Sequence, residues 1–353
     1  MNTGNQLCGA LVGYGFIAER GHAPAYARQR DLRIVAVADT TPARRARAAA
    51  DLPGARIYTD HQTMLEREAG RIGFVDIATP PSTHAPIATA ALTRGLHVLC
   101  EKPIATTAAA ARSLATLARA KRRVFFPSHN YKHAPVVRTL RRILDAGTVG
   151  RIHLATLQTF RTTHARGVDE WRPDWRRERA FSGGGIGMDH GPHTFYLAFD
   201  WLGGHPTSVT AKTSTTRGHD TEDDFHCTLT FPGGIAVASL TWNAGARKVI
   251  YTLHGDHGAI RVEDDDIETT VAGEPGTPPR HVRETVSSHW QDASHADWFV
   301  SLFGDFAAAI DREEWIGREA EDAVRAIELI ETAYASARRH SVEEPFARLR
   351  RAV

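Results

Sequence analysis

The chain has 353 residues, with 43 Lys and Arg against 41 Asp and Glu, so its formal net charge is only +2. This balance argues against the broad basic field that draws a protein to nucleic acid or to a membrane surface. The length predicts two domains, each with enough residues for its own core.

The number of cysteines and the first residues of the chain indicate in which cellular compartment the protein works. Three cysteines are an odd number, which argues against a disulfide framework or a metal set. The first six residues resemble no signal peptide, and no apolar run is long enough to span a membrane. We therefore expect a cytoplasmic protein that binds no metal ion, no nucleic acid and no membrane.

The first predicted element is a buried strand that ends in a glycine-rich turn. Residues 7–12 are an apolar run, and Gly13, Gly15 and Ala18 follow with the G-x-G-x-x-A spacing of a dinucleotide-binding turn. Gly13 would permit the tight turn, Gly15 would let a pyrophosphate approach the backbone, and Ala18 would let the next helix pack closely. The N–H groups and dipole of that helix would bind the phosphates.

The second predicted strand, residues 32–38, ends at Asp39, about 20 residues after the turn. A carboxylate at this position accepts hydrogen bonds from the adenosine ribose and repels a 2′-phosphate. The alternative is that Asp39 caps a helix or a turn. Arg44 and Arg45 begin the following helix and could reach a 2′-phosphate, although arginines at a helix start usually point to solvent. We therefore expect NAD as the cofactor, with NADP less favoured.

Strands and helices alternate up to residue 128. We expect strands at 56–58, 74–78, 97–100 and 124–128, and helices at 42–51, 61–68, 85–94 and 107–122. This alternation predicts a parallel, α/β sheet with right-handed crossovers, in which ligands bind beyond the carboxyl ends of the strands. The chemistry-bearing residues at 39, 79–81, 101–102 and 128–130 all follow such ends.

The second half has the period-2 pattern of an antiparallel sheet. After a helix at 135–146, we expect strands at 152–161, 207–216, 224–231, 235–242 and 255–262. Residues 272–279 should form an exposed loop, and helices at 294–310 and 318–338 should follow. The chain is thus predicted to hold a Rossmann domain at 1–129 and an α+β domain with an open, mostly antiparallel sheet at 130–353.

A run of three glycines, residues 183–185, precedes Asp189 and His193. These two residues are four apart and would share one helix face, where the carboxylate would fix the tautomer of the imidazole and raise its basicity. The glycines would let a substrate or a nicotinamide lie against bare backbone. Gly191 and Pro192 argue against a regular helix, and a helix cap with a satisfied histidine is an equal alternative.

Taken together, these motifs resemble the glucose–fructose oxidoreductase / inositol dehydrogenase / MocA family over nearly the whole chain. The resemblance rests on the glycine turn, the Ala38-Asp39 pair, the Thr-Pro-Pro-Ser-Thr-His stretch at 79–84, and Glu-Lys-Pro at 101–103. It continues through Asn130-Tyr131, Trp175-Arg176, the glycine run with Asp189 and His193, and the Tyr-Ala-Ser-Ala stretch at 334–337. The Glu-Lys-Pro and Gly-Gly-Gly…Asp-x-x-x-His elements are specific in this order.

The resemblance implies a set of site residues. Lys102 would lie near the reacting carbon and stabilise alkoxide charge or relay a proton. His193 would accept the hydroxyl proton, with Asp189 orienting it or binding a substrate hydroxyl. The implied cofactor contacts are Gly13, Tyr14, Gly15, Phe16, Ile17, Asp39, Thr79, Pro80, His84, Glu101, Lys102 and Asn130. The implied substrate contacts are Lys102, Tyr131, Trp175, Arg176, Asp189 and His193, with Asn130 also lining the sugar site.

The resemblance also implies an activity. We expect an NAD(H)-dependent oxidoreductase that transfers hydride between nicotinamide C4 and a secondary alcohol or ketone of a sugar, sugar derivative or cyclitol. Family branches that act on nucleotide-linked ketosugars often carry tyrosine where His193 stands, so His193 favours inositol-like or free-sugar alcohols. The alternatives are a redox-assisted glycosidase or lyase with tightly bound NAD, and a regulatory protein that binds NAD without catalysis. The C-terminal sheet would build a homodimer or homotetramer.

Two stretches carry weaker expectations. The Arg- and Trp-rich segment at 171–179 is predicted to be a solvated loop, with binding of a carboxylate or phosphate on the substrate as the alternative. The acidic cluster at 219–224 is predicted to be a solvated turn rather than a metal site, because it lacks a fixed ligand geometry.

Overall fold

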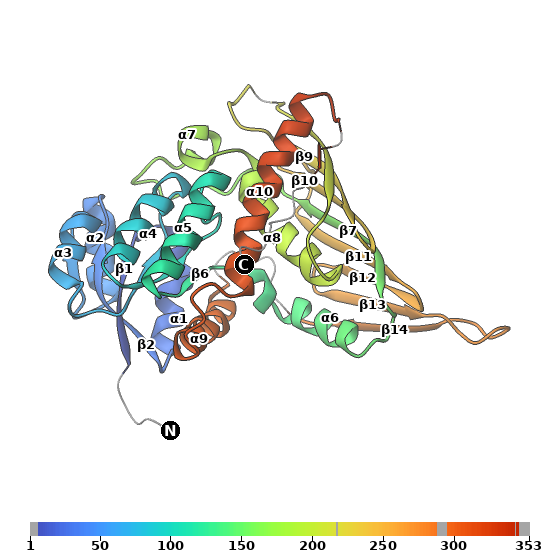
Figure 1. Ribbon diagram of the computed structural model, residues 1–353, viewed down its shortest axis with the longest axis horizontal. Coiled ribbons are helices and arrows are strands. Elements are labelled where there is room, and N and C mark those ends of the chain that lie inside the picture. The colour runs from blue at the N-terminus through green and yellow to red at the C-terminus, as the bar shows by residue number, and fades with distance from the viewer. Residues whose placement is uncertain (1–5, 217, 288–294, 343, 346–353) are drawn as a thin grey trace. The chain divides into compact units, whose positions relative to one another are not determined.

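The computed structural model describes residues 6–216, 218–287, 295–342 and 344–345. The chain divides into two units, each described here by itself (Figure 1). The first unit comprises residues 1–133, 165–183 and 292–324, and the second comprises 134–164, 184–291 and 325–353. The predicted boundary between the two domains, at residues 129 and 130, stays a prediction. In the structure, two later segments of the chain also pack with the first unit.

The first unit is built on a six-stranded parallel sheet with the order β3-β2-β1-β4-β5-β6. This is the strand order of a Rossmann fold, so the predicted α/β class is confirmed. The strands are β1 (Leu7–Val12), β2 (Leu32–Ala38), β3 (Arg56–Tyr58), β4 (Phe74–Ile77), β5 (His97–Cys100) and β6 (Phe125–Pro127). Strands β1, β4 and β5 are central and nearly continuous in apolar residues, as strands covered on both faces must be.

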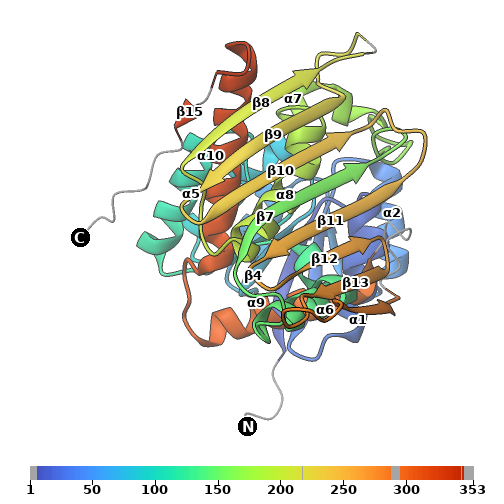
Figure 2. The ribbon, with the colours of Figure 1, turned by 90° about the vertical axis from the view of Figure 1, so that its right-hand side faces the viewer.

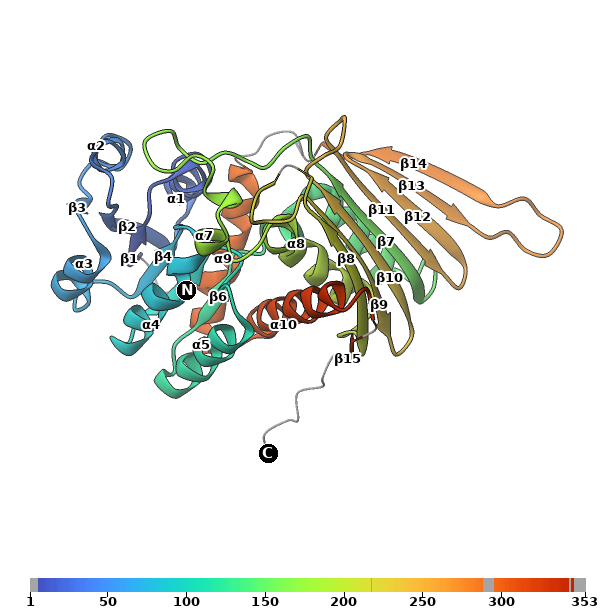
Figure 3. The same ribbon diagram turned by 90° about the horizontal axis from the view of Figure 1, so that it is seen from above.

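Helices connect these strands and cover both faces of the sheet, as right-handed crossovers require (Figure 3). The connections after β1 and β2 are η1 (Ala18–His22) with α1 (Ala23–Arg28), and α2 (Pro42–Asp51). The later ones are α3 (His61–Glu68), η2 (Pro81–Thr83) with α4 (His84–Thr93), and α5 (Ala108–Lys121). Helix α4 packs against α5 and α3. The unit continues into η3 (Asn130–His133).

A helix from late in the chain completes the core of the first unit. Helix α9 (Ala296–Asp311) packs against α1 (Figure 1). Its aromatic side chains Phe299, Phe303 and Phe306 are fully buried with Tyr26 and Phe74. Burying an aromatic side chain of this size stabilises the fold by about 1.5–3 kcal/mol, so removal of α9 would expose a large apolar surface. The remaining elements of this unit are η4 (Trp175–Arg177) and α7 (Arg179–Ser182).

The second unit is built on a nine-stranded sheet with the order β14-β13-β12-β11-β7-β10-β9-β8-β15, which Figure 2 shows broadside. All neighbours are antiparallel except β10 and β7, so the predicted mostly antiparallel sheet is confirmed. The strands are β7 (Ile152–Phe160), β8 (Ser208–Ser214), β9 (Asp224–Phe231), β10 (Gly234–Thr241), β11 (Lys248–Gly255), β12 (Gly258–Glu263), β13 (Asp266–Val271), β14 (Arg280–Thr285) and β15 (Glu344–Pro345).

Helices of the second unit lie on one face of this sheet (Figure 3). Helix α8 (Ile186–Trp201) packs against β10, β7 and β9, and α6 (Pro135–Asp145) contacts β13. Helix α10 (Arg318–Arg338) begins in the first unit and continues through the second. Among the described residues, no helix of this unit covers the other face, which Figure 2 shows from the front. That face presents the alternate, exposed residues of the strands, as in β9.

The second half of the chain contains more strands than we predicted, and the predicted strands lie close to their expected positions. Strand β9 has the predicted bounds and α10 does too, whereas β11, β13, β14 and β15 were not predicted. Strand β14 is exposed along its whole length and carries the charged sequence RHVRET, so it lacks the alternating apolar pattern that marks a strand. The loop at 272–279 is exposed as predicted. The predicted start of the helix at residue 294 lies outside the described residues.

Candidate active site

The glycine turn is built as the sequence predicts. Gly13 has φ +86°, and a Cβ there would lie 2.7 Å from Thr79 Cγ2 and 2.8 Å from the Ala78 carbonyl oxygen, so only glycine fits. A Cβ on Gly15 would meet no atom within 4 Å, so the backbone there has open space beside it. Phe16 is 44% exposed on the turn. Room beside Gly15 at a helix start is what a bound pyrophosphate requires.

Asp39 lies beside this turn and is held there by backbone. Its Oδ2 accepts a hydrogen bond from the Tyr14 N–H at 2.7 Å, and its Oδ1 accepts one from the Thr41 N–H at 2.7 Å. The two bonds fix the carboxylate at the carboxyl end of β2. Asp39 therefore organises a turn, as its alternative interpretation proposes, and its contact with the ribose stays a prediction. The Tyr14 side chain points away from the turn, and its hydroxyl donates to Asp51.

Arg44 corrects the expectation that the arginines of α2 point to solvent. Its side chain is buried, its Nε donates to the Tyr14 carbonyl oxygen at 2.7 Å, and its guanidinium pairs with Glu19. The Glu170 carboxylate lies 3.5 Å from the same guanidinium. The reason is that Arg44 lies one turn into α2 on the face that meets the glycine turn, where carboxylates offset its burial. Arg45 is partly exposed and donates to the Asp39 carbonyl oxygen at 2.9 Å.

The loop after β4 is tied to the loop after β5 by His84. This ring has no exposed surface, and its two nitrogens each lie 2.7 Å from a carbonyl oxygen, that of Pro103 and that of Thr79. Burial lowers the pKa of the His84 ring. What the structure shows for His84 is thus a connection between two loops that carry predicted site residues. Its contact with the cofactor, like those of Thr79 and Pro80, stays a prediction.

Glu101 and Lys102 follow β5, and sequence reasoning missed the residue that holds Glu101. The Oε1 atom of Glu101 lies 3.1 Å from Nε2 of His22, while its Oε2 accepts a weak hydrogen bond from the Lys102 N–H at 3.3 Å. His22 also contacts Asp76, with 2.8 Å between Nδ1 and Oδ2. The available signal was the position of a histidine nine residues after Gly13, on the helix that starts at the turn.

Asn130 and Tyr131 follow β6 within η3. Both are buried, and the Asn130 side-chain oxygen has no hydrogen-bond partner among the described residues. Tyr131 contacts Trp298 edge to face, with 5.7 Å between ring centroids. The first unit therefore gathers the glycine turn, Asp39 and the loops after β4, β5 and β6 at one edge of its sheet, as predicted for a ligand site.

Trp175 and Arg176 belong to the segment at 165–183, which packs with the first unit. The Arg176 guanidinium lies over the Trp175 ring at 4.2 Å and donates to the Ala165 carbonyl oxygen. Helix α7 packs against η2, the turn that follows β4. Within 171–179 only Arg177 is buried, and the other residues are exposed or half-buried, so the predicted solvated loop is correct in part and also contains the short helix η4. The substrate contacts of Trp175 and Arg176 stay a prediction.

Asp189 and His193 lie on α8 in the second unit. The helix continues through Gly191 and Pro192, against the expectation of an irregular helix, because its apolar residues are held in the core of this unit. Nδ1 of His193 lies 2.9 Å from the Tyr196 hydroxyl. We did not predict this partner, although residues three apart on a helix are neighbours. Asp189 lies 3.7 Å from Nε2 of His190. His193 is 4% exposed.

The glycine run before α8 is required by packing within the protein. Our expectation was that these glycines let a substrate or a nicotinamide lie against bare backbone. A Cβ on Gly184 would lie 2.3 Å from the Tyr334 hydroxyl, and one on Gly185 would lie 1.9 Å from the Glu222 carbonyl oxygen. The Glu222 carboxylate accepts hydrogen bonds from the N–H groups of Gly185 and Gly187 at 2.9 and 3.0 Å. A carboxylate at a helix start is favoured by the helix dipole, so Glu222 anchors the helix that carries His193.

The acidic cluster at 219–224 is therefore not a fully solvated turn. Glu222 and Asp223 are buried, and Asp223 accepts hydrogen bonds from the backbone and hydroxyl of Thr216 at 2.9 and 3.0 Å. Across the described ranges, no three His, Cys, Asp or Glu residues are grouped so as to hold a metal ion. None of the described helices is long and apolar enough to cross a membrane.

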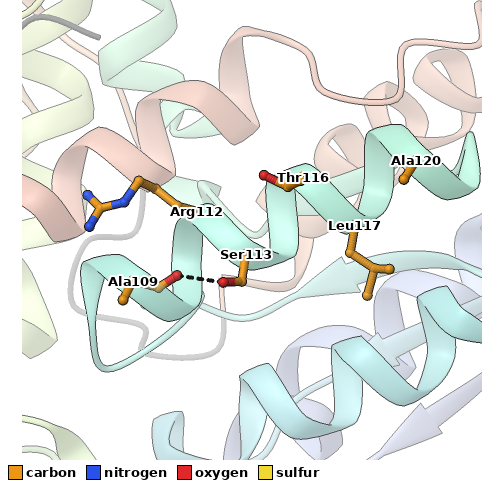
Figure 4. A pocket seen from close by; sticks show the side chains of 6 residues that line it. All are labelled: Ala109, Arg112, Ser113, Thr116, Leu117 and Ala120. Carbon is orange, nitrogen blue, oxygen red and sulfur yellow. Dashed lines mark hydrogen bonds between the residues drawn. The ribbon is translucent and has the colours of Figure 1, made fainter.

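A surface pocket runs along α5, and Figure 4 shows the side chains that line it. They are Ala109, Arg112, Ser113, Thr116, Leu117 and Ala120. The Ser113 hydroxyl donates to the Ala109 carbonyl oxygen of its own helix at 3.0 Å, as the dashed line in Figure 4 marks. No predicted site residue lines this pocket, so it has no part in the candidate site.

Family models match most of the chain. Residues 9–129 match a model described as "Oxidoreductase family, NAD-binding Rossmann fold", and residues 137–261 match the GFO/IDH/MocA C-terminal domain.

Similar proteins support the same assignment. The chain is 30% identical to dTDP-3,4-didehydro-2,6-dideoxy-α-D-glucose 3-reductase from Streptomyces antibioticus, over 93% of this chain and 96% of that protein. It is 27% identical to inositol 2-dehydrogenase from Rhizobium meliloti, over 92% and 95% respectively. A solved structure of levoglucosan dehydrogenase in complex with NADH and levoglucosan has a TM-score of 0.84 at 23% identity, covering 98% of this chain and all of that one.

Proposed function

Because the chain belongs to the GFO/IDH/MocA family of NAD-binding oxidoreductases, we propose that it transfers hydride between a secondary alcohol of a sugar, sugar derivative or cyclitol and NAD. The observation that carries the proposal is the position of Glu101 and Lys102. They follow β5 at the same sheet edge as the Gly13 turn and Asp39. A dinucleotide that binds the turn and Asp39 extends along this edge, so its reactive end is expected beyond the neighbouring strands.

The residues present fit NAD. Gly15 has open space beside its backbone, and two backbone N–H groups hold the Asp39 carboxylate beside the turn, which supports its proposed contact with the ribose hydroxyls. Asn130 keeps a buried side-chain oxygen without a partner among the described residues, which a ligand N–H or hydroxyl would satisfy. Bound NAD supplies the hydride acceptor for alcohol oxidation and, as NADH, the donor for ketone reduction.

Lys102 and His193 are proposed to handle charge and protons at the reacting alcohol. A lysine ammonium stabilises the alkoxide charge that develops on oxygen as the hydroxyl loses its proton, and this charge is consumed when the carbon gives up hydride and becomes a carbonyl. His193 would take the hydroxyl proton at Nε2 while its Nδ1–H donates to the Tyr196 hydroxyl, and the 2.9 Å between Nδ1 and that oxygen allows this hydrogen bond. Asp189 is proposed to orient His193 or to bind a substrate hydroxyl.

The substrate class is proposed from His193. Its place in the Asp-x-x-x-His element favours polyol substrates such as inositol-like cyclitols or free sugars. Inositol 2-dehydrogenase among the relatives supports this choice. The reductase that acts on a dTDP-linked sugar, which the chain matches over nearly its full length, supports a nucleotide-linked ketosugar as the second candidate.

One assay separates the proposed activity from its alternatives. Purified protein is incubated with NAD and a panel of polyols and sugars, and both NADH formation and loss of substrate are measured. Net NADH formation supports the dehydrogenase. Substrate turnover without net NADH would instead indicate a redox-assisted glycosidase or lyase, and NAD binding with neither would indicate a regulatory protein.

A homodimer or homotetramer is proposed to form through the sheet of the second unit. The exposed face of β9 presents His226, Thr228 and Thr230 at alternate positions, and these are short or flat side chains that permit close packing. Light scattering would give twice or four times the mass of 38.7 kDa for the chain. A monomer at micromolar concentration would contradict this proposal.

A further inference from the structure

A buried histidine connects two strand ends at the proposed nicotinamide end of the cofactor site. His22 ends η1, and none of its side chain is exposed. Its Nδ1 lies 2.8 Å from Asp76 Oδ2 on β4, and its Nε2 lies 3.1 Å from Glu101 Oε1 after β5. Strands β4 and β5 are neighbours in the sheet. One imidazole thus joins the helix of the glycine turn to the loop that carries Lys102.

The geometry determines the charge of this histidine. Both ring nitrogens face carboxylate oxygens, which accept hydrogen bonds, so both nitrogens must carry protons if the carboxylates are ionised. Burial favours the neutral ring, yet Asp76 and Glu101 outweigh it and raise the pKa of His22 to about 10. Burial likewise opposes ionisation of Glu101, but His22 and Lys102 lower its pKa.

Stability alone is a poor reason for such a cluster. The His22 ring lies against Phe299 and Phe303, with ring centroids 4.4 and 5.4 Å apart, so the surroundings are apolar. Taking ions out of water into such surroundings costs free energy, and apolar side chains of similar volume often stabilise a core as well or better. The arrangement does, however, hold Oε1 of Glu101 at His22, while the other oxygen, Oε2, accepts the weak hydrogen bond from the Lys102 N–H.

We propose that His22 is a positioning residue for the cofactor, which holds Oε1 of Glu101 so that Oε2 meets a hydroxyl of the nicotinamide ribose. This inference rests on the proposed function, because the family resemblance implies that Glu101 contacts the cofactor and the nicotinamide end is expected beyond β5. Asp76 in turn orients His22, and Tyr26 donates to the same Asp76 oxygen at 3.0 Å. His22 acts through Glu101 and does not itself touch the cofactor.

The chain offers matched variants that separate the two bonds of His22. The amide nitrogen of His22→Gln can stand near the place of Nε2 and donate to Glu101, whereas that of His22→Asn stands near the place of Nδ1 and donates to Asp76. Tyr26→Phe is the control, because it removes a buried hydrogen bond to Asp76 without touching Glu101. The dissociation constants of NADH and ADP are measured by titration for each, since ADP lacks the nicotinamide ribose.

We expect His22→Asn to weaken NADH binding by roughly tenfold to a hundredfold, the usual effect of losing a partner behind a binding group. His22→Gln should bind NADH more tightly than His22→Asn, and ADP binding should be unchanged throughout. Tyr26→Phe should weaken NADH binding far less than His22→Asn, because His22 keeps both of its own partners. In a Glu101→Gln background, His22→Asn should have little further effect, because the two residues act as one unit.

The proposal is overturned if His22→Asn binds NADH like Tyr26→Phe, or if its effect adds fully to that of Glu101→Gln. All of these readouts are binding constants, so they stay informative even if no polyol is oxidised and the proposed activity is wrong. Should the His22 variants fail to bind ADP, ¹⁵N-labelled histidine in the wild-type protein gives the answer. Both His22 nitrogens should be protonated at pH 8, and a neutral ring there would overturn the proposal.

Discussion

We expect a preference for NAD over NADP because of how Asp39 is held. Two backbone N–H groups bind its carboxylate at 2.7 Å each, so it cannot swing away from a 2′-phosphate. The perturbation is Asp39→Asn, which removes the charge and keeps the size of the side chain. We expect wild type to bind NADH at least tenfold more tightly than NADPH. In the variant, the ratio of these two affinities should be smaller.

The magnitude comes from the charge pair that NADPH would create. One unit of phosphate charge about 4 Å from the carboxylate costs about 1 kcal/mol at the dielectric constant of water and about 4 kcal/mol at that of a protein surface. This range corresponds to a roughly fivefold to several hundredfold difference in affinity. The second phosphate charge adds to it, so a tenfold preference is a conservative expectation.

Arg44 determines how far the difference in affinity between NADH and NADPH falls in the Asp39→Asn variant. Its guanidinium is already bound to Glu19 and to the Tyr14 carbonyl oxygen, so removing the Asp39 charge alone leaves it engaged. Adding Glu19→Gln should weaken the hold on Arg44, which keeps the Tyr14 carbonyl oxygen and Glu170 as partners, and should improve NADPH binding beyond the single variant. Fluorescence titration of NADH and NADPH against wild type, Asp39→Asn and the double variant measures each step. Equal affinities of wild type for the two cofactors would refute the reasoning.

Three further outcomes are expected. Lys102→Ala and His193→Ala should each lower turnover by ~10²–10⁴ without loss of NADH binding in titrations, and near-normal turnover would remove that residue from the mechanism. Tyr196→Phe should lower turnover by only about tenfold and should shift the acidic limb of the pH–rate profile, because it removes the hydrogen bond at His193 Nδ1. An unchanged pH–rate profile would count against His193 as the proton acceptor held by Tyr196. Because the pKa of His22 is raised from 6.5 to about 10, its contribution to the free energy of unfolding is full below pH 6.5 and declines as pH rises towards 10. The stability of wild type relative to His22→Gln, measured by urea unfolding, should therefore fall by on the order of a few kcal/mol between pH 7 and 10, and a constant difference would contradict it.

Local patterns predicted the parts of the site that depend on neighbours in sequence. The Gly13 turn and the Asp39 position follow from motif spacing, because the backbone conformation and the strand end are local properties. Pro192 was misleading, since packing of the other α8 side chains outweighs the loss of one helical hydrogen bond.

Contacts between distant residues could not be read from the sequence. The glycines at 184 and 185 looked like room for a ligand, yet Tyr334 and Glu222 occupy that space from far along the chain. Likewise, the partners of His22 lie 54 and 79 residues away, on β4 and just after β5. A single sequence records neither pairing, because each arises only when the sheet and helices have packed.

The most direct test of the central claim follows the hydrogen itself. A polyol that gives activity is labelled with deuterium on its secondary alcohol carbon and incubated with the enzyme and NAD, and the cofactor is analysed by mass spectrometry. We predict that the deuterium appears on the nicotinamide ring of NADH, and that Lys102→Ala transfers it at least a hundredfold more slowly. Substrate consumption with no deuterium on the cofactor at any time would contradict hydride transfer to NAD.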